Sequence, residues 1–273
     1  MIIDGKKIAH EILHELATRH KKRAYTMAII SVAPNFATQR YLRIKKRVAA
    51  KLGIELTVMT LEDDATTETV LEHMEACGAF DGVVLQLPYP AHIDVAVLLC
   101  ALKASQDCDA MGDDLRKMFD AGDETVLPPV VAAIAYSAHA YGVSFNNKAV
   151  VVIGKGRLVG APATVWATRQ GGKVVSLSNL DTKEPHLQTA DIIILGAGVP
   201  ALVSPSMIKN GVVIFDAGTS EEEGKLAGDA DPSCASVASL ITPVPGGIGP
   251  IAVALLFSNL YTLGARKDAL SID

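Results

Sequence analysis

A tyrosine and a lysine lie four residues apart in the segment Phe36–Leu52, which has the pattern of a helix. Tyr41 and Lys45 therefore lie on one face of that helix, one turn apart. Such a phenol and ammonium group can contact one substrate, and a lysine in a partly dry pocket can act as a base because burial favours its neutral form. Four more basic side chains lie on the same segment: Arg40, Arg43, Lys46 and Arg47. A second interpretation, in which Lys45 is one more solvated charge, therefore stays open.

Two further polar residues are candidates for the same chemistry. Gln86 ends an apolar strand in VVLQLPYP. A side-chain amide at the carboxyl end of a parallel strand faces the crevice where α/β proteins bind ligands, although it could equally cap the next turn. Asp109 belongs to the acidic segment QDCDAMGDD, and chemistry alone does not distinguish it from Asp107, Asp113 or Asp114.

The segment Lys148–Pro162 (KAVVVIGKGRLVGAP) predicts a phosphate-binding loop. Ala149–Ile153 is a short apolar run that suits a strand buried in a parallel sheet. Gly154, Gly156 and Gly160 follow, ahead of a predicted helix. They allow a tight turn and a close backbone approach to a pyrophosphate, which free N–H groups at the helix start can bind. The spacing G-x-G-x-x-x-G is one residue longer than the usual dinucleotide motif, so a turn that binds nothing is the alternative.

The elements that must position these residues alternate between strands and helices. In the first half we expect strands at Met27–Ala33, Ile54–Met59 and Gly82–Leu87, and helices at Lys6–Lys22, Phe36–Leu52, Thr66–Cys77 and Ala91–Lys103. Gly53 stands where a left-handed helix cap is expected. This alternation predicts a parallel, layered α/β domain. Asp107–Asp123 has little periodicity and is expected to be a loop and a domain junction.

The second half repeats the alternation around the glycine-rich segment. A helix is expected from Pro128 or Pro129 to about Gly142, and a last apolar helix from about Ile251 to Leu263. Strands are expected at Ala149–Ile153, Lys173–Ser178, Asp191–Leu195, Val212–Asp216 and Ser239–Ile241. This pattern predicts a doubly wound, Rossmann-like dinucleotide-binding domain.

Composition narrows the class of partner. The 273 residues allow two domains of ordinary size, and 49% of them are apolar and 20% charged. A net charge of -5, without a Lys/Arg-rich run, argues against nucleic acid as the main partner. The longest apolar runs, Val130–Ala135 and Ile251–Phe257, are too short to span a bilayer. The four scattered cysteines show no metal-binding spacing, so we expect reduced thiols, a cytoplasmic protein and no metal site.

Together these segments resemble one family, the bifunctional methylenetetrahydrofolate dehydrogenase/methenyltetrahydrofolate cyclohydrolases, over essentially the whole chain and in the same order. IIDGKKIA is similar to the family's opening, ATQRYLRIKKRVAAKLGI to its catalytic helix, and DGVVLQLPYP to its G-x-x-x-Q-L-P-L-P strand. The region around Asp107–Asp109 is similar to its D-V-D-G loop, and VVIGKGRLVGAP to its G-R-S-x-x-V-G-x-P cofactor loop. KLAGDAD and then ITPVPGGIGPIAVALL resemble its C-terminal signature, of which TPVPGG-[VI]-GP is the most specific part.

The resemblance implies a role for each candidate residue. Lys45 would be the central catalytic lysine, acting in proton transfer. Tyr41 would pack on or hydrogen-bond the folate, Gln86 would hold and tune the lysine, and Asp109 would bind the pterin ring. Further substrate-binding residues would be Leu87, Pro88, Pro245, Gly246, Gly247 and Pro250. The dinucleotide would be bound by Gly154, Lys155, Gly156, Arg157, Gly160, Asp181, Gly198 and Thr219.

The implied reaction is oxidation of 5,10-methylenetetrahydrofolate by a nicotinamide cofactor, followed by hydrolysis of the methenyl cation to 10-formyltetrahydrofolate. The resemblance implies NADP, with NAD as the alternative. Single residues point in opposite directions, because Lys155 and Arg157 could meet a 2′-phosphate whereas Asp181 would repel it or bind a ribose diol. We expect a homodimer with a tetrahydrofolate derivative as substrate, and neither nucleic acid nor a membrane as partner.

The expected architecture is a folate-binding catalytic domain at residues 1–126, completed by the C-terminal helix 251–273, and a dinucleotide-binding domain at residues 127–250, with a cleft between them. The chain also departs from the family pattern. The family's D-V-D-G-F reads DCDAM, with Ala110 in place of the glycine, its Thr-Pro is Pro128–Pro129, and its G-P-M-T ends in Ile251–Ala252. Two alternatives to a bifunctional enzyme therefore stay open. One is a relative with only one of the two activities, and the other is a binding protein without turnover.

Overall fold

The computed structural model describes residues 1–19, 23–178, 185–222 and 224–270. The chain divides into two compact units. The first, called the three-stranded unit, consists of Glu11–Pro128 and Val253–Asp273. The second, called the five-stranded unit, consists of Met1–His10 and Pro129–Ala252. Each unit is built on a parallel sheet, which confirms the predicted α/β class with two domains.

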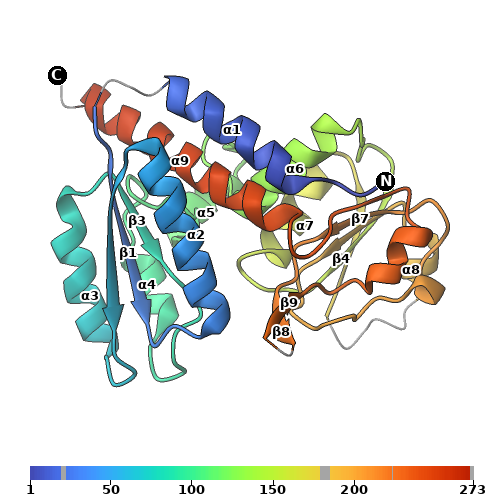
Figure 1. Cartoon of the computed structure of the whole chain (residues 1–273), viewed down its shortest axis with the longest axis horizontal. Helices are drawn as coiled ribbons and strands as arrows, with labels where there is room; N and C mark the ends of the chain where they lie inside the picture. The colour runs from blue at the N-terminus through green and yellow to red at the C-terminus, as the bar shows by residue number, and fades with distance from the viewer. Residues whose placement is uncertain (20–22, 179–184, 223, 271–273) are drawn as a thin grey trace. The chain divides into compact units, whose positions relative to one another are not determined.

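The three-stranded unit has the strand order β2-β1-β3. Its elements are β1 (Thr26–Val32), α2 (Phe36–Leu52), β2 (Glu55–Leu61), α3 (Thr67–Ala76), η1 (Cys77–Ala79), β3 (Gly82–Leu85), α4 (Val95–Ala101) and α5 (Asp113–Asp120). Helices α2 and α3 lie on opposite sides of the sheet (Figure 1), and the central strand β1 is buried from Met27 to Val32. The chain order reverses next to β1, so the loops after β1 and β3 flank the point where such sheets bind ligands.

Helix α2, which carries Tyr41 and Lys45, has a defined start and end. The side chain of Asn35 accepts a hydrogen bond from the backbone N–H of Thr38 and caps the start. Gly53 has φ 69° and donates its N–H to the carbonyls of the last turn, which confirms the predicted left-handed cap.

The prediction of a loop over Asp107–Asp123 is wrong in its second half, where α5 forms. Two acidic residues in the first turn of α5 favour the helix N-terminus, and Leu115 and Phe119, four residues apart, are both buried. An eight-residue helix is too short for this periodicity to stand out in the sequence. The helix expected at Ala91–Lys103 is also shorter, because Asp94 caps it and α4 begins at Val95.

The five-stranded unit has the strand order β10-β7-β6-β4-β5. Its elements are α6 (Pro129–Ala140), β4 (Ala149–Ile153), α7 (Gly160–Arg169), β5 (Lys173–Leu177), α8 (His186–Thr189), β6 (Ile192–Leu195), η2 (Pro205–Met207), β7 (Val213–Asp216), η3 (Pro232–Ser236) and β10 (Leu240–Ile241). All the ladders of this sheet are parallel, as the doubly wound prediction requires. Here the chain order reverses between β4 and β6, so the loops after these two strands flank the ligand-binding point of the sheet.

Two features of this unit were not predicted. The short strands β8 (Ser220–Glu222) and β9 (Lys225–Ala227) form an antiparallel hairpin. The N-terminus adds a parallel bridge between Ile2 and Ile241 beside β10, where the N–H of Ile3 donates to the carbonyl of Ile241. Three-residue strands and single bridges are too short to give a hydrophobic period.

Two helices have residues in both units, α1 (Gly5–Arg19) and α9 (Ile248–Leu270). By length and composition alone α9 could cross a membrane, but a buried core helix meets the same criterion. In the three-stranded unit its side chains Phe257, Leu260 and Tyr261 are at most 2% exposed. The ring of Tyr261 meets that of Tyr25 edge-on, with 4.7 Å between centroids. This part of α9 is therefore a core element of the unit.

Candidate active site

Lys45 lies on the buried face of α2, together with Leu42, Val48 and Ala49. Its side chain is only 6% exposed, so the interpretation of Lys45 as a solvated charge is wrong. The Lys45 Nζ atom donates a hydrogen bond of 2.8 Å to Oε1 of Gln86, which follows β3. The amide nitrogen of Gln86 in turn donates to the carbonyl of Leu87. The Gln86 amide is thus oriented with its oxygen toward the lysine.

The electrostatic environment favours the neutral form of this lysine. Burial lowers the pKa of Lys45, and the charges of Asp109 and Cys108 oppose that shift. Burial also raises the pKa of Asp109, while the charge of Lys45 lowers it. Desolvation is the dominant cause in both groups, so both shifts favour uncharged forms. An amine that gives up its proton below the ordinary lysine range can serve as a base.

The loop that carries Asp109 is fixed by hydrogen bonds on both sides. Asn259 of α9 donates to the carbonyl of Cys108, at 2.9 Å. The Oδ2 atom of Asp107 accepts the N–H of Gly112 at 2.7 Å, while its buried Oδ1 has no hydrogen-bond partner. Burial raises the pKa of Asp107 to about 7. The charge of Asp109 also raises this pKa, whereas the hydrogen bond from the N–H of Gly112 lowers it. The position of Asp109 is therefore set by α9 and by its neighbours in the loop.

Other predicted substrate residues lie on the same elements. Tyr41 is half-buried and lies one turn before Lys45 on α2. Leu87 and Pro88 follow Gln86 directly and are joined by a cis peptide bond. The three-stranded unit thus carries the predicted tyrosine, lysine, glutamine and aspartate together with the Leu-Pro segment.

The glycine-rich loop between β4 and α7 has the shape that a dinucleotide needs. Gly154 has φ 101°, and a side chain there would collide with the carbonyl of Gly196 after β6. A side chain at Gly160 would collide with the carbonyl of Gly154. Gly156, by contrast, has open space where a side chain would be, so a ligand can approach the backbone closely. The residues present therefore fit a pyrophosphate at the start of α7.

The basic residues of this loop are exposed. Lys155 and Arg157 flank Gly156, and both side chains are accessible to solvent. Gly198 is also exposed, with φ 71°, in the loop after β6, and Thr219 is half-buried after β7. These residues follow neighbouring strands of one parallel sheet at their carboxyl ends.

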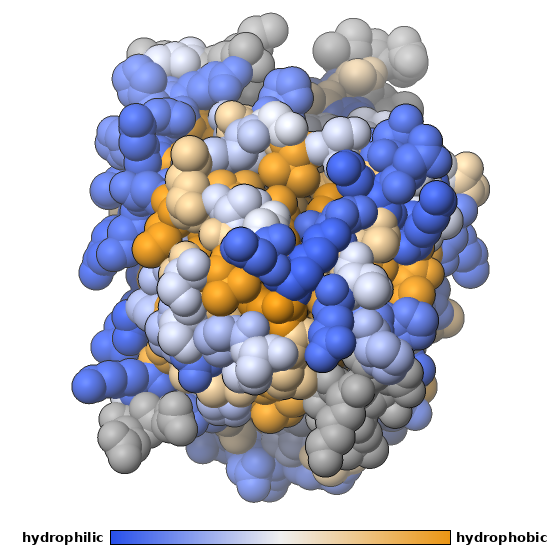
Figure 2. Space-filling model, turned by 90° about the vertical axis from the view of Figure 1, so that its right-hand side faces the viewer, coloured by the Kyte–Doolittle hydropathy of each residue, from blue (hydrophilic) through white to orange (hydrophobic). Residues whose placement is uncertain are grey.

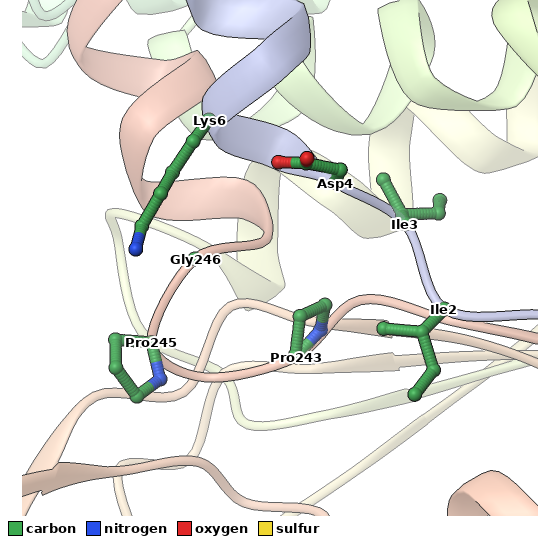
Figure 3. Close-up of a pocket in the computed structure, with 7 residues that line it drawn as sticks. All are labelled: Ile2, Ile3, Asp4, Lys6, Pro243, Pro245 and Gly246. Atoms are coloured by element: carbon green, nitrogen blue, oxygen red, sulfur yellow. The ribbon is translucent and has the colours of Figure 1, made fainter.

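A cavity of about 250 Å³ lies beside the C-terminal signature of the five-stranded unit (Figure 3). Its lining residues are Ile2, Ile3, Asp4, Lys6, Pro243, Pro245 and Gly246. The side chain of Lys6 extends toward the segment that holds Pro245 and Gly246 (Figure 3). Two predicted substrate residues therefore line a cavity that the N-terminal segment completes.

Comparison with known proteins agrees with this geometry. Residues 3–109 match the catalytic domain of the tetrahydrofolate dehydrogenase/cyclohydrolase family, and residues 128–268 match its NAD(P)-binding domain. The chain belongs to this family.

Individual relatives cover the chain almost completely. A protein of Hydrogenobaculum named "Bifunctional protein FolD" is 32% identical over 98% of this chain and 99% of its own. The crystal structure of the bifunctional enzyme FolD from Campylobacter jejuni is 29% identical in sequence, with a TM-score of 0.91. The match covers 98% of this chain and 99% of that one. A Trypanosoma brucei FolD in complex with NADP and an inhibitor is 27% identical, with a TM-score of 0.89 and 98% coverage of both chains.

Not every residue of these sites follows from the sequence. Asp181 falls outside the described residues. Asp4 and Lys6 were not predicted as lining residues, because the N-terminal segment is far in sequence from the Pro245 loop. Asp216 and Asp229, which hold loops of the five-stranded unit, were also missed, although the segment KLAGDAD stands out as a family signature. No spacing rule connects Asp229 with its partners 30 to 32 residues earlier.

The departures from the family pattern have visible structural consequences. Ala110, where the family has glycine, adopts φ 50° in the left-handed region, which strains a residue with a side chain. Pro129 begins α6, a position that suits proline because no helical N–H is lost. Ile251 is fully buried in α9.

We predict that Gln86→Glu raises the pKa of Lys45. The new carboxylate would replace the acceptor of the lysine hydrogen bond and favour the charged ammonium. The pKa can be followed by NMR of the protein with labelled lysine side chains. Gln39→Glu, an exposed glutamine on the same helix, is the matched control and should leave the titration of Lys45 unchanged. An unchanged Lys45 titration in Gln86→Glu would contradict the described hydrogen bond.

We predict that Ala110→Gly increases the free energy of unfolding by about 0.5 to 1 kcal/mol, because glycine adopts the left-handed conformation without strain. The same substitution at the exposed helical Ala265 should lower it by about 1 kcal/mol. Urea denaturation of the two variants measures both values. Equal destabilisation by the two substitutions would mean that Ala110 is not strained.

Proposed function

We propose that this protein oxidises 5,10-methylenetetrahydrofolate to 5,10-methenyltetrahydrofolate with NADP and then hydrolyses the product to 10-formyltetrahydrofolate. Membership of the family and the near-complete match to bifunctional FolD proteins support both activities. The observation that carries the proposal is the buried hydrogen bond between Lys45 and Gln86, with Asp109 acting on the same lysine.

Lys45 is the base of the hydrolysis step in this proposal. Its lowered pKa lets the neutral amine take a proton from the water that attacks the methenyl carbon. Gln86 holds the amine in place through its amide oxygen. Asp109 binds the pterin ring, and Tyr41 contacts the folate from the same face of α2.

The dinucleotide side of the reaction belongs to the five-stranded unit. NADP held by this unit would supply the hydride acceptor for oxidation of the methylene carbon. Gly154, Gly156 and Gly160 let the pyrophosphate approach the backbone. The exposed Lys155 and Arg157 supply positive charge for the 2′-phosphate. The T. brucei relative that binds NADP supports this choice of cofactor.

The remaining assignments concern the folate. We assign the folate to residues 1–126 with 251–273, and the dinucleotide to residues 127–250. Leu87 and Pro88 bind the substrate on the catalytic side. We also propose Pro245, Gly246, Gly247 and Pro250 of the C-terminal signature as substrate contacts, since Pro245 and Gly246 line a cavity of the five-stranded unit.

A relative with a single activity is the second candidate. The observation behind it is the departure at Ala110, which adopts φ 50° directly after the proposed pterin-binding Asp109. Separate assays of methylenetetrahydrofolate oxidation and methenyltetrahydrofolate hydrolysis, with NADP and NAD in parallel for the first, distinguish the two candidates.

We predict that Lys45→Met lowers cyclohydrolase turnover by at least about 100-fold, because general-base catalysis contributes that much or more. Steady-state hydrolysis of methenyltetrahydrofolate measures the effect, and circular dichroism verifies folding. Lys46→Met is the matched control, since Lys46 is the exposed neighbour on the same helix and should keep full activity. Undiminished hydrolysis by folded Lys45→Met would remove Lys45 from the mechanism.

We further propose that the protein is a cytoplasmic homodimer. All four cysteines are free thiols, as a reducing compartment requires. Among the described strands, β5 pairs only with β4, so its other edge is open to a second copy. Apolar residues also gather near the centre of the face shown in Figure 2, with polar residues around and across them, as on many protein interfaces.

The expected mass in solution is twice the chain mass of 28.7 kDa. Light scattering coupled to size-exclusion chromatography, over a dilution series, measures it. A mass of one chain at every concentration would contradict the homodimer.

A further inference from the structure

Three loops of the five-stranded unit leave the sheet at its carboxyl edge, and two buried aspartates connect them. The loops follow β6, β7 and β10, and they contain the proposed ligand residues Gly198, Thr219 and Pro245. The aspartates are Asp216, which is 2% exposed, and Asp229, which is fully buried.

Asp229 holds the loop after β6 by its backbone. Its Oδ2 atom accepts the N–H of Ala197 at 2.6 Å and that of Gly198 at 3.2 Å, and its Oδ1 atom accepts the N–H of Val199 at 2.9 Å. Three consecutive backbone N–H groups thus converge on one carboxylate, an arrangement that binds anions. The left-handed φ of Gly198, 71°, belongs to this arrangement.

Asp216 connects Asp229 to the two other loops. Its carboxylate accepts the N–H groups of Gly218, Asp229 and Ala230. Its backbone N–H donates to the hydroxyl of Thr242 at 2.7 Å, at the start of the C-terminal signature. A continuous set of hydrogen bonds therefore leads from Thr242 through Asp216 and Asp229 to Gly198.

The fit around the two carboxylates leaves no room for side chains. A side chain at Gly218 would collide with the carboxylate of Asp229, and one at Gly228 with Oδ2 of Asp216. Burial raises the pKa of Asp229, and the three N–H groups lower it. Burial raises the pKa of Asp216 to about 7, opposed by the N–H of Ala230 and assisted by the charge of Asp229. Two buried acids so close together are costly, and backbone N–H groups compensate them.

The loop that Asp229 holds is one of the two that flank the reversal of strand order. The other is the glycine-rich loop, and the two touch, since a side chain at Gly154 would collide with the carbonyl of Gly196. Ligands of doubly wound sheets bind at this point. We propose that Asp229, supported by Asp216, is a positioning residue for the dinucleotide, which fixes the backbone of residues 197–199 in its binding shape. The inference rests on the proposed function.

Asp229→Asn tests it, because the amide nitrogen would face N–H donors and break part of the arrangement. We expect the dissociation constant for NADP to rise about tenfold or more, as the loss of charge-assisted hydrogen bonds implies. Cyclohydrolase turnover, which uses no dinucleotide, should stay within about twofold of the wild type, because such a change is below 1 kcal/mol. Isothermal titration with NADP and methenyltetrahydrofolate hydrolysis measure the two effects. Asp231→Asn, the same change two residues later on a side chain that contacts Ser233, should alter neither.

A purely structural role would lower both activities together with thermal stability, and that result, or unchanged NADP affinity, would overturn the proposal. If Asp229→Asn does not fold, Asp216→Asn carries the test, since asparagine keeps the size of the side chain and one oxygen acceptor for the N–H groups that Asp216 holds. For Asp216→Asn we expect NADP binding about threefold weaker than in the wild type, because only the hydrogen bonds that support Asp229 are weakened. An unchanged NADP affinity of this variant would overturn the proposal. A wild-type protein that does not bind NADP would instead refute the proposed function.

Discussion

An amine enclosed by protein must be compensated or must give up its proton, and Lys45 is under this constraint. Its nitrogen donates to a neutral amide, that of Gln86, and burial shifts its pKa downward. An amide acceptor orients the amine without adding the charge that would stabilise the ammonium. The nearby carboxyl of Asp109 is itself shifted toward its neutral form. The three-stranded unit therefore holds a lysine whose neutral form is favoured by exclusion of water.

The surrounding elements maintain that exclusion. Lys45 lies on the buried face of α2, whose start is capped by Asn35 and whose end is capped by Gly53. Gln86 follows β3, and the loop of Asp109 is held by Asn259 of α9, from the other end of the chain. A shift of any of these elements would admit water and return the lysine to its ordinary charged form.

The five-stranded unit meets a different requirement, because it must present its backbone to an anionic ligand. Glycines at 154, 156 and 160 bring the loop after β4 close to its neighbours and leave space at Gly156. The carboxylate of Asp229 accepts backbone N–H groups of the loop after β6 and so fixes its shape. One unit thus uses a buried side chain on a helix, next to the end of β3, and the other uses positioned backbone at the carboxyl ends of parallel strands.

The sequence by itself determined the α/β class, most strands, the cap at Gly53 and the candidate residues Tyr41, Lys45, Gln86 and Asp109, because buried strands, glycines and family motifs are local patterns. It did not determine that Lys45 is buried, because four neighbouring basic residues are typical of a helix face that is exposed to solvent. It also missed α5, which is too short for a period, and the left-handed conformation of Ala110. The family resemblance already paired Gln86 with Lys45, and the structure gives that pair a hydrogen bond. Only the tertiary structure joined Asn259 to Cys108 and Asp229 to Gly198. These contacts connect residues 31 to 151 positions apart, and such pairings arise from the packing of whole elements rather than from local sequence.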